Sequence, residues 1–182
     1  FGGTSDFTNS GTITVTGSTN GQGIGFYNYG NGTITNSGTA SGREGIKHVS
    51  GSLAITNSGT LTGSVVDINN DATVTSLTNS QGGSDILTFD GKRPTNYYIV
   101  NSSTTKFGKI SFANESSAMT FNIDSSSTLT NGTYSSVISS LASSSLVGTT
   151  GTSDAKTWTL SETSSGSGIW NLVITTTGGG RS

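Results

Sequence analysis

The sequence contains no cysteine, one proline and one histidine among its 182 residues. Without cysteine, the chain can form no disulfide framework, no thiolate nucleophile and no cysteine-ligated zinc site. A Ser-His-Asp mechanism would have only His48 available as its base. These absences exclude several classes of enzyme and all disulfide-stapled small domains.

Charged and apolar residues are also scarce. Charged residues make up 10% of the chain and hydrophobic residues 29%, whereas typical domains have about 25% and about 45%. The eight Lys and Arg residues are scattered and form no basic stripe, which argues against nucleic acid as a partner. No stretch approaches the roughly 18 consecutive apolar residues of a membrane-spanning helix, so we expect no membrane insertion by this segment.

Small and neutral polar residues dominate instead, with 27 Gly, 33 Ser, 32 Thr and 15 Asn. Such a composition cannot fill a wide hydrophobic core. A net charge of only -2 is too small for self-repulsion to favour a disordered chain. A β-solenoid, in which paired backbone surrounds a thin apolar column, is consistent with both observations.

A short motif recurs along the first half of the chain. Thr-Asn-Ser-Gly-Thr begins at Thr8, Thr35 and Thr56, and a degenerate Thr-Asn-Ser begins at Thr78, at intervals of 27, 21 and 22 residues. An apolar residue flanks each motif in a fixed frame. The longer interval contains the Gly-rich stretch 17–23, which is suited to a loop at a corner. Self-similarity at this period is typical of solenoids.

The residues around each motif alternate between apolar residues and Thr, as at 12–16 and 33–35. This alternation predicts strands, and two or three short strands per 21 residues describe one coil of a parallel β-helix. Stacked coils about 4.8 Å apart would bury ladders of like residues. Asn36, Asn57 and Asn79 fall at equivalent corners, where we expect left-handed backbone and amides hydrogen-bonded along the axis.

The second half has a different character, because the repeat stops near residue 84 and nine of the 14 aromatic residues follow it. This concentration predicts a wider core. Strands are expected at 86–89, 97–100, 109–112, 119–123, 158–161 and 169–174, with 134–141 ambiguous and with loops at 125–127 and 141–154.

Three segments follow from these patterns. We expect regular coils over residues 1–84 and irregular coils with a C-terminal cap over residues 85–177. A terminal cap is the usual way to cover an open sheet edge. Residues 178–182 resemble a linker or tag remnant, and the chain begins without Met. We therefore expect a piece of a longer protein.

Several stretches together resemble the passenger domain of a bacterial autotransporter. They are the NSGTITG-type repeats, the bridge GSDILTF at 83–89, and the ending WTL at 158–160 with GIWNLVI at 168–174. The resemblance implies a right-handed parallel β-helix that is exported through the outer membrane and displayed, extracellularly, on a Gram-negative cell surface. It also implies that the last coils nucleate folding. Passengers include adhesins, self-associating proteins, toxins and proteases, so the fold alone leaves the activity open.

His48 shows no catalytic context. It lies in the expected strand 45–49, and neither a GxSxG elbow nor a Gly-Asp-Ser-Gly nucleophile loop occurs in the chain. We interpret His48 as a surface residue on a coil, which disfavours a serine protease.

Paired carboxylates on adjacent coils could hold Ca²⁺ or act as acid and base, as in polysaccharide-cleaving β-helices. The candidates are Asp67, Asp71, Asp85 and Asp90, with Lys92 and Arg93 nearby. However, 67–71 and Asp90-Gly91 are typical of turns, and the stretch 82–87 holds only one incomplete copy of a calcium-binding nonapeptide. We expect no catalytic residue, no metal and no other cofactor, with polysaccharide cleavage as the alternative.

Threonines recur in Thr-x-Thr pairs at Thr12/Thr14/Thr16, Thr33/Thr35, Thr60/Thr62 and Thr73/Thr75. Stacked outward threonines are what ice-binding solenoids present. Thr is also simply a good outward residue of a strand. Ice binding is therefore a further alternative.

Tyrosines are the candidate ligand-binding residues: Tyr27, Tyr29, Tyr97 and Tyr98. They can contact sugars or proteins through an apolar ring and a polar hydroxyl, and the first two adjoin the Gly-rich insertion. The prediction is a non-enzymatic, surface-displayed segment that acts in adhesion, self-association or as a stalk. Its expected partners are a host or matrix protein, a glycan or another copy of itself.

Overall fold

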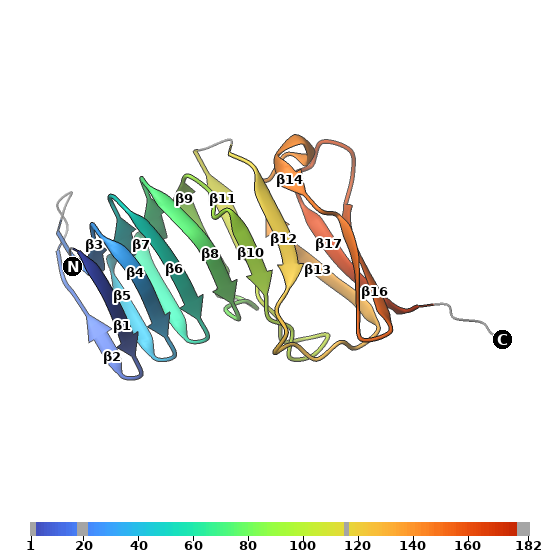
Figure 1. Cartoon of the computed structure of the whole chain (residues 1–182), viewed down its shortest axis with the longest axis horizontal. Helices are drawn as coiled ribbons and strands as arrows, with labels where there is room; N and C mark the ends of the chain where they lie inside the picture. The colour runs from blue at the N-terminus through green and yellow to red at the C-terminus, as the bar shows by residue number, and fades with distance from the viewer. Residues whose placement is uncertain (1–2, 18–21, 115–116, 178–182) are drawn as a thin grey trace.

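The computed structural model describes residues 3–17, 22–114 and 117–177. In this part of the chain, the strands stack side by side along the long axis, from the N-terminal coil at one end to a set of hairpins at the other (Figure 1). The predicted parallel β-solenoid is confirmed, because successive coils pair in parallel through two sheets. No helix in these residues is long and apolar enough to cross a membrane.

The first sheet has seven parallel strands in chain order. They are β1 (Thr4–Asn9), β4 (Asn31–Asn36), β6 (Ser52–Asn57), β8 (Thr73–Asn79), β10 (Asn96–Ile99), β12 (Met119–Ile123) and β14 (Leu146–Val147). Each complete coil contributes one strand to this sheet and then crosses to the other.

The second sheet has ten strands. Those of the coils are β2 (Thr12–Thr14), β3 (Ile24–Asn28), β5 (Thr39–His48), β7 (Thr60–Asn70), β9 (Leu87–Gly91), β11 (Ile110–Ala113) and β13 (Gly132–Ser139). Three more close its C-terminal end: β15 (Thr150–Ser153), β16 (Lys156–Glu162) and β17 (Trp170–Thr176). Both β2 and β3 pair with β5.

The period-two alternation places one residue of each strand in the same inward column. Its members in the first sheet, aligned by strand register, are Phe7, Ile34, Ile55, Leu77, Tyr97 and Phe121. All are buried except Phe7, which packs against the core from the first coil. The column changes from aliphatic to aromatic along the axis, so the core widens in the second half as the composition indicates.

The Asn-Ser-Gly corners are held by bonds to the preceding coil. The backbone N–H groups of Ser58 and Gly59 donate to Asn36 O (2.9 and 3.0 Å), and that of Thr60 donates to Gly38 O (2.9 Å). A Cβ on Gly59 would overlap the carbonyl oxygen of Gly38. Glycine is required here because adjacent coils approach closely, and its φ is not left-handed.

The long strands β5 and β7 bend midway around the solenoid. The register between them shifts from Gly42 to Glu44, which is a β-bulge and bends the strand. A Cβ on Gly42 would overlap Gly23 O, and one on Gly63 would overlap Val66 O. Only glycine therefore fits at these two bends.

The strand predictions for the second half agree with the structure to within a few residues. The segments expected at 86–89, 97–100, 109–112 and 119–123 are β9 to β12, and the ambiguous 134–141 lies largely in β13. The same two sheets continue across residue 84, since β7 pairs with β9 and β8 with β10.

The C-terminal end departs from the coil pattern. Residues 141–154, expected as a loop, contain a 3-10 turn (Ser143–Ser145), β14 and β15. The expected strands at 158–161 and 169–174 are β16 and β17, but β13, β17, β16 and β15 pair antiparallel. Short connections join β15 to β16 and β16 to β17 as successive hairpins, and β17 then pairs antiparallel with β13 of the last coil.

Aromatic side chains join this cap to the last coils. Trp158 packs edge-on against Phe121 with ring centroids 5.4 Å apart. The indole of Trp170 donates to Leu141 O (2.9 Å), so its buried N–H is satisfied. The expected linker at 178–182 lies outside the described residues, as do residues 18–21 of the Gly-rich insertion.

Candidate functional site: a corner groove and two buried polar ladders

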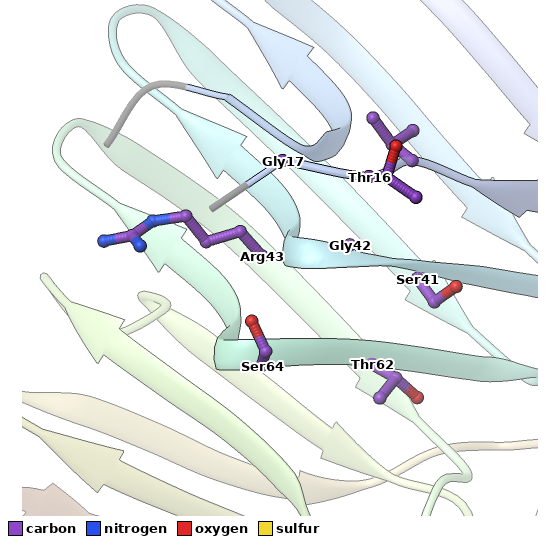
Figure 2. Close-up of a pocket in the computed structure, with 8 residues that line it drawn as sticks. Thr16, Gly17, Ser41, Gly42, Arg43, Thr62 and Ser64 are labelled. Atoms are coloured by element: carbon purple, nitrogen blue, oxygen red, sulfur yellow. The ribbon is translucent and has the colours of Figure 1, made fainter. Parts of the chain in front are cut away.

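A groove of about 570 Å³ follows the bend of the first three coils. We call it the corner groove, and its lining residues are Val15, Thr16, Gly17, Ser41, Gly42, Arg43, Thr62 and Ser64. Figure 2 shows Ser41 and Thr62 on neighbouring strands, with Arg43 extending from the bend. The groove is therefore built from equivalent positions of successive coils.

Strand register explains why hydroxyl groups gather there. Thr14, Ser41 and Thr62 pair across β2, β5 and β7, so their side chains point to the same outer face. Val15 N–H donates to Ser41 O (3.0 Å) and continues this pairing beyond β2. The sheet thus presents a row of hydroxyls at the spacing of the coils.

The chemistry of the lining is simple. Thr16, Ser41, Thr62 and Ser64 each offer a hydroxyl, which donates and accepts, and the Arg43 guanidinium carries the one charge among the described lining residues. None of the eight lining residues has a carboxylate or an imidazole. This set can hold a polar, negatively charged ligand, but it contains no general acid or base for neutral pH.

Asp67 holds the bend beside the groove. Its carboxylate accepts from the backbone N–H of Gly63 (2.8 Å) and of Thr88 (2.9 Å), and the Thr88 hydroxyl accepts from Asp67 N–H (2.9 Å). Burial raises the pKa of Asp67, although these hydrogen bonds oppose the rise. Asp67 lies within β7 and not in the expected turn, so it is a structural clamp between coils.

Asp85 lies close enough to Asp67 for its negative charge to add to the rise in the pKa of Asp67, although burial is the largest cause; Asp71 and Asp90 have separate partners. Asp71 forms an exposed ion pair with Lys47 (3.3 Å). Asp90 accepts from the Asn114 amide (3.0 Å), and Asp85 is exposed. The described residues contain no group of three or more His, Asp or Glu side chains that could hold a metal ion.

The two basic residues near Asp90 differ from each other. Arg93 is buried, stacks over Phe112 at 5.6 Å and donates to Ser117 O (2.7 Å), whereas Lys92 is exposed. Arg93 therefore serves packing between coils.

The four candidate tyrosines do not form one site. Tyr29 is exposed and lies edge-on to half-buried Tyr27 with ring centroids 5.1 Å apart, but neither lines the corner groove. Tyr97 as a ligand contact is wrong, because it is fully buried in the inward column. Tyr98 alternates to the outer face and is half-buried.

The asparagines of the repeat form a buried amide ladder. Asn9 Nδ2 donates to Asn36 Oδ1 (2.9 Å), Asn36 to Asn57 (3.1 Å) and Asn57 to Asn79 (3.2 Å). The expected left-handed backbone is wrong, since no member has a positive φ and each is the last residue of its strand. The extended backbone aims the amides inward, where stacked hydrogen bonds satisfy them.

His48 belongs to a second ladder, and its predicted surface position is wrong. The side chain is fully buried between Asn28 and Asn70 of the adjacent coils. Asn28 Nδ2 lies 3.0 Å from His48 Nδ1 and can only donate, so Nδ1 accepts. Nε2 then carries the proton and donates toward Gly51 O (2.9 Å).

The Thr-x-Thr pairs are divided between the two sheets. Thr33 and Thr35 lie in β4 of the first sheet, whereas Thr12, Thr60 and Thr62 lie in β2 and β7 of the second. The pairs thus form no single continuous face. The longest aligned column of threonines in the described strands is Thr8, Thr35, Thr56 and Thr78, of which only Thr35 belongs to a Thr-x-Thr pair.

The corner groove itself was missed by sequence reasoning. The signal was present, because Ser41-Gly42 and Thr62-Gly63 occupy the same frame after consecutive motifs. Their shared position could have predicted stacked hydroxyls before a bend. No family model, curated protein or solved structure matches the chain. A function for it therefore has to be inferred from the fold and the corner groove.

Proposed function

We propose that this chain is a non-enzymatic, surface-displayed segment of an autotransporter-type passenger, and that it acts in adhesion by binding an acidic glycan in the corner groove. One observation carries the proposal: Arg43 and four hydroxyl-bearing residues line the same groove, and none of its eight described lining residues has a carboxylate. The corner groove replaces the tyrosines as the candidate ligand-binding site, and the adhesive role stays the same.

The groove fits the chemistry of a sugar acid. A guanidinium binds a carboxylate through two parallel hydrogen bonds, and Ser and Thr hydroxyls can exchange hydrogen bonds with sugar hydroxyls. The volume of about 570 Å³ lies in the usual range for small-ligand sites. Because the hydroxyls repeat along the coil axis, successive sugar units can meet similar surroundings.

Binding without cleavage is supported by the same lining. Glycoside hydrolysis needs two carboxyl groups about 5–9.5 Å apart across the scissile bond. None of the described lining residues has one, and the Asp67 carboxylate beside the groove is buried and accepts hydrogen bonds from two backbone N–H groups. A ligand in the groove would be held and left intact.

Extracellular display is part of the proposal. It is supported by the absence of cysteine and by the Ser-, Thr- and Asn-rich coils, which resemble secreted repeat proteins. The partner would then be a glycan on a host cell or matrix.

Calorimetric titration tests the proposal with sialyllactose and trigalacturonate as acidic probes and lactose as the neutral counterpart. We expect binding of at least one acidic probe and none of lactose. Arg43→Gln should weaken this binding at least tenfold, and Thr62→Val more modestly. The matched control is the Tyr27→Ala/Tyr29→Ala double variant, which should bind normally.

Two results would contradict the proposal. Binding of neither acidic probe, or binding that is unaffected by Arg43→Gln, would remove the groove as a site. Release of reducing ends from polygalacturonate would show an enzyme instead.

A further inference from the structure

A second hollow begins at the bend of β7, next to the corner groove. Its volume is about 370 Å³, and it is formed by residues of β7, β9 and β11 together with the residue that follows β11. These strands are neighbours in the second sheet and succeed one another along the stack (Figure 1). We call the hollow the carboxylate cleft, and its lining includes Val65, Thr88, Asp90, Ser111, Ala113 and Asn114.

We propose that the carboxylate cleft binds a protonated amino sugar. The ammonium group would lie at Asp90 and Asn114, the sugar hydroxyls would meet Thr88 and Ser111, and the apolar face of the ring would pack on Val65. The cleft is distinct from the corner groove, its described lining carries the opposite charge, and the inference does not depend on the function proposed for that groove.

The cleft exists because β7 and β9 pair over only part of their length. Backbone pairing joins residues 68–70 to residues 89–91, and residues 64–66 at the bend have no partner in β9 among the described pairings. Just after the bend, Asp67 N–H donates to the Thr88 hydroxyl and the Asp67 carboxylate accepts from Thr88 N–H, both at 2.9 Å. A side chain thus helps to join the two coils where regular pairing is missing.

One wall of the cleft is apolar and open to solvent. Val65 is 59% exposed, the largest fraction for any large apolar side chain in the described part of the chain. Ala113 is also exposed, and the buried rings of Phe89 and Phe112 border the cleft from the core side. Binding sites for small ligands combine such apolar walls with a few convergent polar groups.

Asp90 supplies the one charge among the described lining residues. The Asn114 amide donates to Asp90 Oδ1 (3.0 Å), and within the described part of the chain the carboxylate forms no ion pair and accepts no other side-chain hydrogen bond. Arg93 stacks over Phe112 and donates to Ser117 O instead. The second oxygen of Asp90 is therefore available to a cationic ligand.

Asn114 adds a second acceptor beside this carboxylate. It follows β11 with a φ of 68°, a left-handed conformation that asparagine tolerates better than most residues. Its amide nitrogen is used on Asp90, and its carbonyl oxygen accepts no hydrogen bond from the described residues. An ammonium group has three donors and no acceptor. It matches one carboxylate oxygen and one amide oxygen better than the two-pronged guanidinium does.

A row of hydroxyl groups lies next to this charge. Strand register pairs Thr88 with Ser111, and Ser111 with Ser139, so the three side chains follow the coil axis on the outer face. Asp90 lies two residues beyond Thr88 on the same strand, which places it on the same face about 7 Å away. A ligand that carries both an amine and several hydroxyls uses the charge and the row together, whereas a lysine side chain would use only the charge.

Calorimetric titration of the whole chain, in slightly acidic buffer that keeps the amine protonated, tests the proposal with the trimer of glucosamine. The N-acetylated trimer is the neutral counterpart, and cadaverine is an amine without hydroxyls. We expect saturable binding of the glucosamine trimer, no binding of the N-acetylated form, and at least tenfold weaker binding of cadaverine.

Two variants locate the binding in the cleft. Asp90→Asn should weaken binding of the trimer at least tenfold, and Val65→Ser at least threefold. Asp154→Asn is the matched control and should bind normally. It removes an exposed carboxylate in the turn between β15 and β16, where asparagine tolerates the φ of 48°. Arg43→Gln should also bind the trimer normally, so that failure of the corner groove and failure of the cleft are separate results.

Three results would overturn the proposal. They are absence of binding up to millimolar trimer, equal loss of binding in Asp90→Asn and Asp154→Asn, and binding of cadaverine as tight as that of the trimer. If Asp90→Asn lowers the melting temperature, the Val65→Ser variant decides, because its change lies on an exposed side chain. Unchanged binding in that variant would then overturn the proposal.

Discussion

Asn57 lies at the centre of the amide ladder and tests it at the scale of one residue. Its amide donates to Asn79 Oδ1 (3.2 Å) and to Gln81 Oε1 (2.9 Å), and it accepts from Asn36. Asn57→Ala leaves buried partners unsatisfied, so we expect the free energy of unfolding in urea to fall by about 1–3 kcal/mol.

The adjacent Ser58 provides the control, because its side chain is exposed. Ser58→Ala should change stability by no more than about 0.5 kcal/mol. Equal effects of the two variants would contradict a stabilising ladder.

Asp67 gives the protein a pH dependence of known sign. Burial raises its pKa in the folded state, so the Asp67 carboxyl group binds its proton more tightly in the folded protein than in the unfolded chain. The contribution to stability is fully present below the ordinary Asp pKa of about 3.9, and it is lost as pH rises through the raised pKa.

Urea unfolding of the wild type and of Asp67→Asn between about pH 4 and about pH 7 measures this effect. We expect the stability of the wild type relative to the variant to be greater at the acidic end. A difference that stays constant, or grows with pH, would contradict the burial of this carboxylate.

His48 and Tyr97 show why some single residues were misjudged. The alternation that placed Ile46 inward also places His48 inward, but a buried imidazole is satisfied only if partners exist, and sequence alone does not show them. Tyr97 follows the inward column of Leu77. Tyr97 is buried because of the register between its coil and the preceding one. The degenerate motif at Thr78 does not mark that register clearly in the sequence.

At the scale of an element, the corner glycines make the sharpest prediction. Gly38→Ala places a Cβ against Gly11 O, and relieving that overlap requires the two coils to separate. We expect a loss of about 1–3 kcal/mol in the free energy of unfolding. The Cβ of Gly11→Ala meets no atom of the described residues within 4 Å, so this variant should have little effect. Chemical denaturation measures the free energy of unfolding of both variants. Similar decreases in the two would contradict the close stacking of Gly38 on the first coil.

The strands of the coils were predictable because alternation and the repeat act together. Alternation gives the face of each residue, and Thr-Asn-Ser-Gly fixes the register of each corner. β14 and β15 lack both signals, since β14 has two residues and β15 (Thr150–Ser153) contains no large apolar residue, whereas β16 and β17 alternate and were predicted. The antiparallel pairing of the cap depends on tertiary contacts that no local pattern encodes.

The corner groove has one feature that the sequence predicts and one that depends on tertiary contacts. Its hydroxyls follow the repeat frame and were predictable in principle. The bend that exposes them depends on Gly42, Gly63 and the Asp67 clamp. Sequence reasoning took the last of these for a turn residue.

At the scale of the whole molecule, the stack has two different ends. The C-terminal end is made of antiparallel hairpins, where Trp158 meets Phe121, and the N-terminal end is a parallel coil. The two sheets continue through residue 84, so a chain cut there would expose a new edge. We expect residues 1–84 alone to lack a cooperative unfolding transition and residues 85–182 alone to retain one, and equal stability of the two halves in circular-dichroism melts would contradict the cap assignment.

Native-state hydrogen exchange of the full chain tests this account most directly. In one continuous stack whose last coil packs on aromatic hairpins, backbone amides should be slowest to exchange in the strands from β4 to β12, remain slow in β13 and β17, and become fast in β1 and β2. The protection of backbone amides against exchange should not change abruptly at residue 84. An abrupt change of protection there, or a first coil better protected than the cap, would contradict the account.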